Sequence, residues 1–283
     1  MPLHNNNFKE ENIMVVQHNL SAMNTNRQMG VVTSSLQKST EKLSSGYKIN
    51  RAGDDAAGLS ISEKMRSQIR GLNKASDNAQ DGISLIQVAE GALNEVHSIL
   101  QRMNELATQA ANDTNTSVDR GSINDELKEL NSELDRISST TQFNKQNLLD
   151  GGFSGALQVG ALKGQTMALK ISTAVSANKL KVSDIKVSTN ANAGAAMEKI
   201  QTAIETVSKQ RSKLGAIQNR LEHTINNLDT NAENTQAAES RIRDTDMADE
   251  MVQYSKNNIL SQAGNSMLTQ ANQQTQGVLS LLQ

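Results

Sequence analysis

The sequence predicts a mainly α-helical protein. We expect a long antiparallel helical, coiled-coil bundle, formed by the N-terminal and C-terminal halves of the chain, with a small β-hairpin in the middle. Apolar residues recur at intervals of three and four in both halves, as in coiled-coil helices, whereas one central segment alternates with a period of two. Aromatic residues are 2% of the 283-residue chain, and tryptophan is absent. Each buried position therefore removes little area from water, which favours thin helical layers over a thick core.

Residues 1–13 differ in composition from the rest of the chain. They contain Pro2, the only proline, and an Asn-rich run, and the heptad pattern begins only after Met14. The codons AAG-GAG-GAG can encode residues 9–11, and such a purine run at this distance before Met14 is the kind that recruits bacterial ribosomes. We therefore expect residues 1–13 to be translated leader sequence, or else a short disordered arm.

Residues 14–45 are predicted to form one amphipathic helix, because apolar residues recur at every seventh position. Its apolar seam is Val15, Ala22, Met29, Leu36 and Leu43. Gly46 follows directly, where a glycine commonly ends a helix. Residues 46–57, rich in small and polar side chains, are expected to be an irregular connector.

Residues 58–152 carry the strongest helical pattern and are predicted to hold two helices. The first has two apolar rows over seven heptads, and its second row consists of many alanines and glycines that allow close approach of a partner helix. The first row is Met65, Leu72, Ala79, Ile86, Leu93, Leu100 and Ala107, and the second runs from Ile61 through Gln68, Ala75 and Gly82 to Ala110. The turn-forming stretch NDTNTSVD, residues 112–119, then leads into a shorter antiparallel helix with Ile123 to Ile137 on its apolar side.

Residues 153–190 form the region where apolar and polar residues alternate. Leu157 to Ala161 and Met167 to Ile171 have a period of two, with Lys163-Gly164-Gln165 between them. The pattern predicts a β-hairpin, which has to pack against helices because an isolated hairpin is marginally stable.

Heptads resume in residues 191–242, which are predicted to form a long helix with polar residues at a few seam positions. Residues 243–250 break this pattern and form a second connector. The last helix is expected over residues 251–283, with an apolar side. That side consists of Leu260, Met267, Ala271, Val278 and Leu281.

The sequence contains no recognisable active site, so we expect no enzyme, no catalytic residue, no metal site and no cofactor. The histidines His4, His18, His97 and His223 are scattered, and metalloprotease, hydrolase and nucleotide-binding motifs are absent. Asp54 and Asp55 are adjacent, so their side chains point apart, and turn-forming roles outweigh a catalytic pair. A net charge of −2 gives no indication of nucleic-acid binding, and no apolar run has the length of a membrane span.

With these other functions excluded, the sequence patterns favour interaction with other copies of the chain. Each terminal helix carries an apolar seam that a single helix pair covers only in part. Contacts of this kind between unlike surfaces of identical chains generate rings or helical filaments.

Several motifs in order resemble bacterial flagellin. They are NRAGDDAAGLSIS at residues 50–62, TQFNKQNLLDG at 141–151, the long stretch SRIRDTDMADEMVQYSKNNILSQAGNSMLTQAN at 240–272, and LSLL near the end. The first motif contains the connector signature of the family, here Asn50, Arg51, Asp54, Asp55 and Gly58. With about fifty residues between its two rod halves, the chain resembles a short flagellin that lacks the variable outer domains.

The resemblance implies a structural protein of the bacterial flagellum that polymerises into the extracellular filament for motility. It implies that the terminal helices form an inner core and that residues 58–242 form the rod. Implied partners are an export chaperone, the flagellar type III export apparatus, and hook-associated and cap proteins. The alternative is a hook–filament junction protein, which shares the terminal coils.

The resemblance also implies a surface for the innate receptor Toll-like receptor 5. The matching residues are Gln101, Arg102, Glu105, Leu106 and Glu126. Leu106 lies off the apolar seam, and an off-seam leucine beside an arginine is a candidate anchor. Alternatively, Arg102 and Glu126 are ordinary solvated charges, and Leu106 packs on the hairpin or on a neighbouring subunit.

Overall fold

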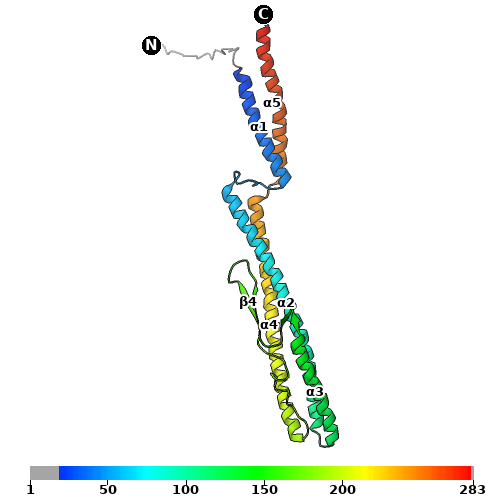
Figure 1. The fold of residues 1–283 in the computed structure, drawn as a ribbon. Helices are drawn as coiled ribbons and strands as arrows, with labels where there is room; N and C mark the ends of the chain where they lie inside the picture. Colours follow the sequence, from blue (N-terminus) through cyan, green and yellow to red (C-terminus); the bar gives the residue numbers. More distant parts are fainter. Residues whose placement is uncertain (1–18, 282–283) are drawn as a thin grey trace, which may run out of the picture. The chain divides into compact units, whose positions relative to one another are not determined.

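The computed structural model describes residues 19–281, and the side chains of all of these except 275 and 278–281. Within this range the chain forms five helices and two small antiparallel strand pairs (Figure 1), which confirms the predicted fold class. The helices are α1 (Leu20–Ser45), α2 (Ala56–Ala110), α3 (Ser117–Thr140), α4 (Asn190–Arg243) and α5 (Met247–Leu281). The strands are β1 (Gln142–Phe143), β2 (Gln146–Asn147), β3 (Phe153–Gln158) and β4 (Thr166–Ile171).

The chain divides into two compact units, and the division falls within α2 and α4. The terminal unit comprises residues up to Glu63 and those from Ala238 onward, and the central unit comprises Lys64–Ala237. Each is described separately below.

In the terminal unit, α1 and α5 pack side by side and antiparallel (Figure 1). Asn19 caps the start of α1, because its Oδ1 accepts a hydrogen bond from the main-chain N–H of Ala22. Its Nδ2 donates to the carbonyl of Ala271 in α5, at 2.9 Å. Near the other end of α1, Lys42 Nζ lies 3.4 Å from Glu250 Oε2. Gly46 ends the helix in the left-handed conformation (φ 76°), with its N–H bonded to Lys42.

The connector signature forms an ordered turn. Asp54 accepts hydrogen bonds from the main-chain N–H groups of Asn50 and Arg51, and these bonds, that of Arg51 first, hold the pKa of the Asp54 carboxyl below its ordinary value. Asp55 caps α2 through a 2.9 Å bond from the N–H of Gly58. Ile49 is buried, and a Cβ built on Gly58 would stand 2.8 Å from its Cδ1. Asp54 therefore holds the turn that precedes α2, and Asp55 caps the start of α2.

Within the terminal unit, the residues that follow α1 also contact the residues between α4 and α5. Tyr47 and Asp244 form an isolated antiparallel bridge, and the N–H of Lys48 donates to the carbonyl of Arg243 at 2.6 Å. The Arg243 guanidinium lies 4.5 Å from the centroid of the Tyr47 ring, a distance that permits a cation–π interaction. Residues expected to be an irregular connector are thus held by specific contacts.

In the central unit, α2 and α4 run antiparallel, and their buried faces contain both alanines and large apolar residues such as Ile86 and Leu221. A Cβ built on Gly82 of α2 would stand 2.4 Å from Leu157 Cδ1 of β3 and 3.4 Å from Leu221 Cδ1 of α4, so both leucines pack over this glycine. Ser76 of α2 donates a 3.0 Å hydrogen bond to Asp229 of α4. The first predicted row is buried from Leu72 through Ala107, as the heptads indicate.

The second predicted row was wrong at its start. Ile61 and Gln68 are exposed, and the buried position is Ser62, whose hydroxyl donates a 2.7 Å hydrogen bond to Glu239. A buried serine is tolerated when its hydroxyl has a partner, so a paired polar residue replaces the isoleucine that hydrophobicity alone selected.

The hairpin is present, but its first strand starts and ends earlier than predicted. β3 and β4 pair antiparallel with Leu157 opposite Met167, and the chain leaves β3 after Gln158. The Gln158 amide donates to the carbonyls of Gly160 and Leu162, which fixes the loop where a strand was expected. The shorter β1–β2 pair was not predicted, and it turns through Asn144 and Lys145, both with positive φ.

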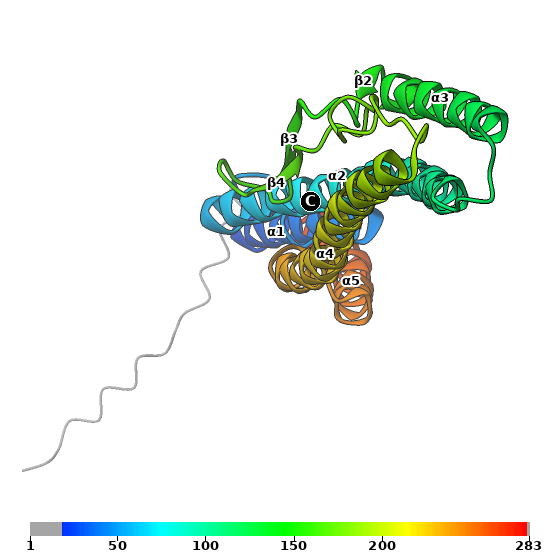
Figure 2. The same cartoon turned by 90° about the horizontal axis from the view of Figure 1, so that it is seen from below.

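The segment 172–189, after the hairpin, is irregular yet largely buried on its apolar side. Three polar side chains of α3 bond to its main chain: Asp135 accepts from Ala177, Asn131 donates to Val182, and Asn124 accepts from Val187. Figure 2 shows α3 and this segment on the same side of the α2–α4 pair. A chain without regular structure is thereby given partners for its buried backbone groups.

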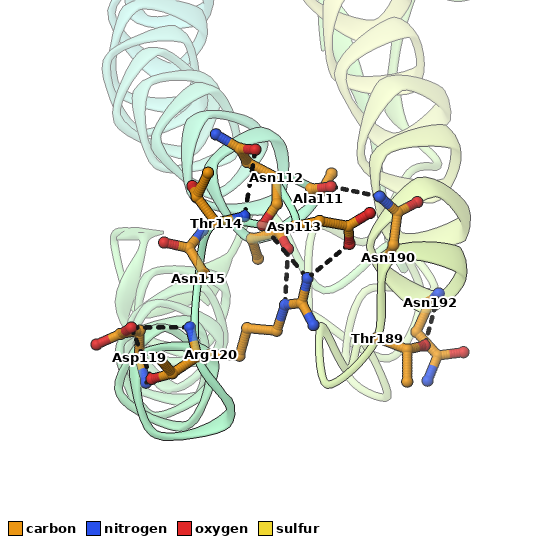
Figure 3. Close-up of polar contacts among 12 residues, drawn as sticks. Ala111, Asn112, Asp113, Thr114, Asn115, Asp119, Arg120, Thr189, Asn190 and Asn192 are labelled. Carbon is orange, nitrogen blue, oxygen red and sulfur yellow. Dashed lines mark hydrogen bonds and ion pairs between the residues drawn. The ribbon is translucent and has the colours of Figure 1, made fainter.

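The turn between α2 and α3 is held by Arg120 (Figure 3). Its guanidinium donates to the carbonyls of Ala110 and Asn112, at 3.1 and 3.3 Å, and lies 3.2 Å from Asp113. Asn190 of α4 donates to the adjacent carbonyl of Ala111. These side chains satisfy carbonyls that the end of α2 leaves without helical partners.

Gly58→Ala should lower the free energy of unfolding by about 1–3 kcal/mol, because the added methyl overpacks Ile49 and displaces the Asp55 cap. The matched control is Gly91→Ala, where a Cβ meets nothing within 4 Å in the interior of α2. That change should raise the free energy of unfolding by about 0.5–1 kcal/mol. Urea unfolding followed by far-UV circular dichroism measures the free energy of unfolding of both variants. Equal changes in the two variants would contradict the close packing of Gly58 against Ile49.

Arg120→Ala should lower the free energy of unfolding by about 1–3 kcal/mol, since it leaves helix-end carbonyls without donors in a partly buried turn. Lys128→Ala is the control, because Lys128 pairs with Asp125 on an exposed face of α3. Exposed pairs contribute about 0–1 kcal/mol. Chemical denaturation of the monomer measures the free energy of unfolding of both variants. If the hydrogen bonds of Arg120 in the turn did not stabilise the monomer, Arg120→Ala would lower this free energy no more than Lys128→Ala.

Candidate interaction surfaces

One half of the predicted polymerisation seam lies in the α1–α5 interface. Ala22, Met29, Leu36 and Leu43 are half-buried at seven-residue spacing. Met29 packs against Gly264 of α5, where a built Cβ would stand 3.8 Å from Met29 Cγ. Val15, the first member of the predicted seam, lies outside the described residues.

The α5 side of this interface is not the predicted apolar row. The residues of α5 that lose exposure follow three–four spacing, with Asn258 in addition, and are mostly small or polar: Glu250, Tyr254, Asn257, Asn258, Ser261, Gly264, Leu268 and Ala271. Of the predicted row only Ala271 is buried, whereas Leu260 and Met267 are exposed. The side chains of Val278 and Leu281 lie outside the described residues. Small side chains bring α5 close to α1, and this leaves its larger apolar side chains facing outward.

These outward residues form what we call the apolar helix-pair surface. It consists of Leu20, Met23 and Val31 of α1, together with Met247, Met251, Val252, Ile259, Leu260 and Met267 of α5. On α5, Val252 and Ile259 are seven residues apart, as are Leu260 and Met267, so they form two adjacent rows along the helix. Large exposed apolar groups clustered on one helix pair mark an interaction surface. Val252 and Ile259 were not selected from the sequence, because the predicted row followed only one of these two rows, that of Leu260 and Met267.

A second candidate surface, which we call the charged rod patch, joins α2 and α3. Arg102 of α2 lies 2.9 Å from Glu126 of α3 and 3.2 Å from Glu105, one turn along α2. Hydrogen bonds to Glu126 first and then to Glu105 raise the pKa of the Arg102 guanidinium above its ordinary value. Gln101 lies beside them, 3.0 Å from His97 Nε2. All four members of the patch, Gln101, Arg102, Glu105 and Glu126, are exposed.

Leu106 does not belong to this exposed patch. It is 2% exposed and lies in the hydrophobic core of the central unit. The expectation that it stands free as an anchor was wrong, because α2 contributes to a core shared with α3 and with the segment 172–189. The buried face of α2 is therefore wider than the seam of a two-helix coiled coil.

Other kinds of site find no support in the residues that the structure describes. Among them, no three or more His, Asp or Glu side chains are grouped so that they could bind a metal ion. No helix in the same part of the chain carries an apolar stretch long enough to cross a membrane.

Comparison with known proteins agrees with the fold and with the motifs of the chain. Residues 16–154 match the bacterial flagellin N-terminal helical region, and residues 197–282 match the bacterial flagellin C-terminal helical region. The chain is 57% identical to a flagellin of Halalkalibacterium halodurans, over 95% of this chain and all of the relative. It is 51% identical to the flagellar filament 31.3 kDa core protein of Treponema maltophilum, with the same coverage.

A solved structure described as a flagellar hook-associated protein from Vibrio parahaemolyticus has a similar fold. It superposes with a TM-score of 0.57 at 14% identity, over 68% of this chain and all of that chain. At this identity the likeness concerns the fold alone. The two matching regions and the high identity over nearly the whole chain establish that the protein belongs to the bacterial flagellin family.

Proposed function

We propose that this chain is a structural subunit that polymerises into the extracellular flagellar filament and serves motility. The observation that carries the proposal is the apolar helix-pair surface, which the folded chain leaves uncovered on α1 and α5. Neighbouring copies of the same chain supply a cover for it, and membership of the flagellin family supports this occupant. Contacts between unlike faces of identical subunits extend into a helical assembly.

Export of the subunit in an unfolded state is part of the same proposal. The partners would be an export chaperone and the flagellar type III apparatus, followed by cap and hook-associated proteins at the filament. The chain has no cysteine and a single proline, Pro2. Refolding outside the cell would therefore involve no disulfide exchange and little prolyl isomerisation.

A hook–filament junction protein is the second candidate, because the flagellin resemblance implies that such proteins share the terminal coils. The two roles differ in quantity and position along the flagellum. Deletion of the gene, followed by motility assays and electron microscopy of sheared filaments, separates them. Filaments of normal length without this chain would exclude the role of major subunit.

We further propose that the charged rod patch is a ligand surface for Toll-like receptor 5. The Arg102 guanidinium is oriented by two carboxylates from two helices, so it is presented in a defined position rather than as a flexible charge. Ordered, exposed arginines are frequent anchors in protein interfaces. Leu106 supports the patch from beneath, within the core.

Polymerisation should depend on the exposed apolar side chains of α5. Leu260→Lys and Met267→Lys should each raise the critical concentration for growth on filament seeds about tenfold or more, because each prevents burial of an apolar group worth about 1.5–3 kcal/mol. Light scattering and electron microscopy measure growth. Removal of residues 260–283 should abolish it.

The matched controls are Leu260→Met and Met267→Leu, which keep the apolar area and should polymerise normally. Circular dichroism confirms that every variant keeps its helices. Normal growth of both lysine variants would exclude this face of α5 from the assembly interface.

Receptor binding should depend on Arg102. Arg102→Ala should weaken the affinity of the monomer for the purified receptor ectodomain by about tenfold or more, the effect of losing an interface hot spot. Arg136→Ala is the control, because Arg136 pairs with Glu133 in a similar exposed geometry on α3. Surface plasmon resonance measures both. An unchanged affinity for Arg102→Ala, or equal losses for the two variants, would reject the assignment.

A further inference from the structure

Four methionines stand out among the exposed apolar residues of the terminal unit. Met23 is 64% exposed, Met247 48%, Met251 51% and Met267 62%. The described methionines of the central unit contrast with them: Met103 and Met167 are buried, and Met65 of α2 and Met197 of α4 are each half-buried. Among the residues whose side chains the structure describes, the exposed methionines therefore all belong to the apolar helix-pair surface.

An exposed thioether is a site for two-electron oxidation. With hydrogen peroxide, the sulfur lone pair attacks one peroxide oxygen, an S–O bond forms and the O–O bond breaks. The departing hydroxide takes up the proton, so that R–S–CH₃ and H₂O₂ give R–S(O)–CH₃ and H₂O. The sulfur is oxidised, the peroxide is reduced, and a flexible apolar side chain becomes a polar one.

We propose that Met23, Met247, Met251 and Met267 are oxidation sites that switch off assembly of the free subunit. This inference rests on the proposed function, since it requires that these side chains enter an interface between copies. None of the four lies in a buried core, so their oxidation leaves the helices folded. A sulfoxide oxygen at each site would have to be desolvated when copies pack together, which disfavours the contact.

The filament should be protected where the free subunit is vulnerable. Assembly covers the four side chains, so peroxide reaches them in the monomer and not in the polymer. The same oxidant dose should therefore mark the two states differently at these positions, while Met103 remains unoxidised in both because it is 0% exposed in the subunit itself.

The test treats purified full-length monomer with hydrogen peroxide, removes the oxidant, and maps sulfoxides by peptide mass spectrometry. We expect Met23, Met247, Met251 and Met267 to oxidise at least about tenfold faster than Met103 and Met167, in line with accessibility. The oxidised monomer should show a critical concentration on seeds raised about tenfold or more, with unchanged helicity. Methionine sulfoxide reductases should restore growth.

The decisive variant carries Met23→Leu, Met247→Leu, Met251→Leu and Met267→Leu, which keep side-chain size and remove the sulfur. It should polymerise normally after the same peroxide treatment, although it retains every other methionine, including Met1 and Met14. Loss of growth in this variant on oxidation, or normal growth of the oxidised wild-type chain, would overturn the proposal. Failure of untreated wild-type monomer to grow on seeds would instead reject the proposed function, and the oxidation map would still test the site assignment.

Discussion

Packing of α2 against α4 is the constraint on which the central unit depends. Gly82 allows Leu157 of the hairpin and Leu221 of α4 to meet over the same turn of α2. A chain with few aromatic residues cannot fill wide gaps, so its helices must pack at short distance to exclude water. The hydrogen bond from Ser76 to Asp229 fixes which turns face each other. The hairpin, α3 and the irregular segment 172–189 are then arranged against this pair.

Heptad spacing predicted the helices and most of the core well, because burial of a helix face leaves a periodic apolar pattern. It failed where a polar or small residue takes the buried position. Ser62 replaces Ile61 in the seam because Glu239 pairs with its hydroxyl, and Gly264, not a large apolar residue, lies next to Met29. Such positions depend on the partner element, and a single helix pattern carries no information about that partner.

The candidate surfaces were predictable to different degrees. The family resemblance marked Arg102 and Glu126 as receptor-contacting residues, but it did not predict that they pair across two helices. The burial of Leu106 could not be inferred, because the seam of a helix pair does not show that a wider core, shared with α3 and the segment 172–189, covers another face of α2. Similarly, the exposed rows of α5 became recognisable only when its contact face with α1 was known.

The terminal unit is built from both ends of the chain, and this affects the order of folding. Asn19 bonds to Ala271 across 252 residues of sequence, so this contact closes a very long loop. Loop-closure entropy and high contact order make such pairings late events. The central unit needs only Lys64–Ala237, and pairing of α2 with α4 within it draws the two ends of that segment together. Folding of the middle of the chain thereby shortens the effective loop that α1 and α5 must close, so the terminal unit is the last part of the chain to form.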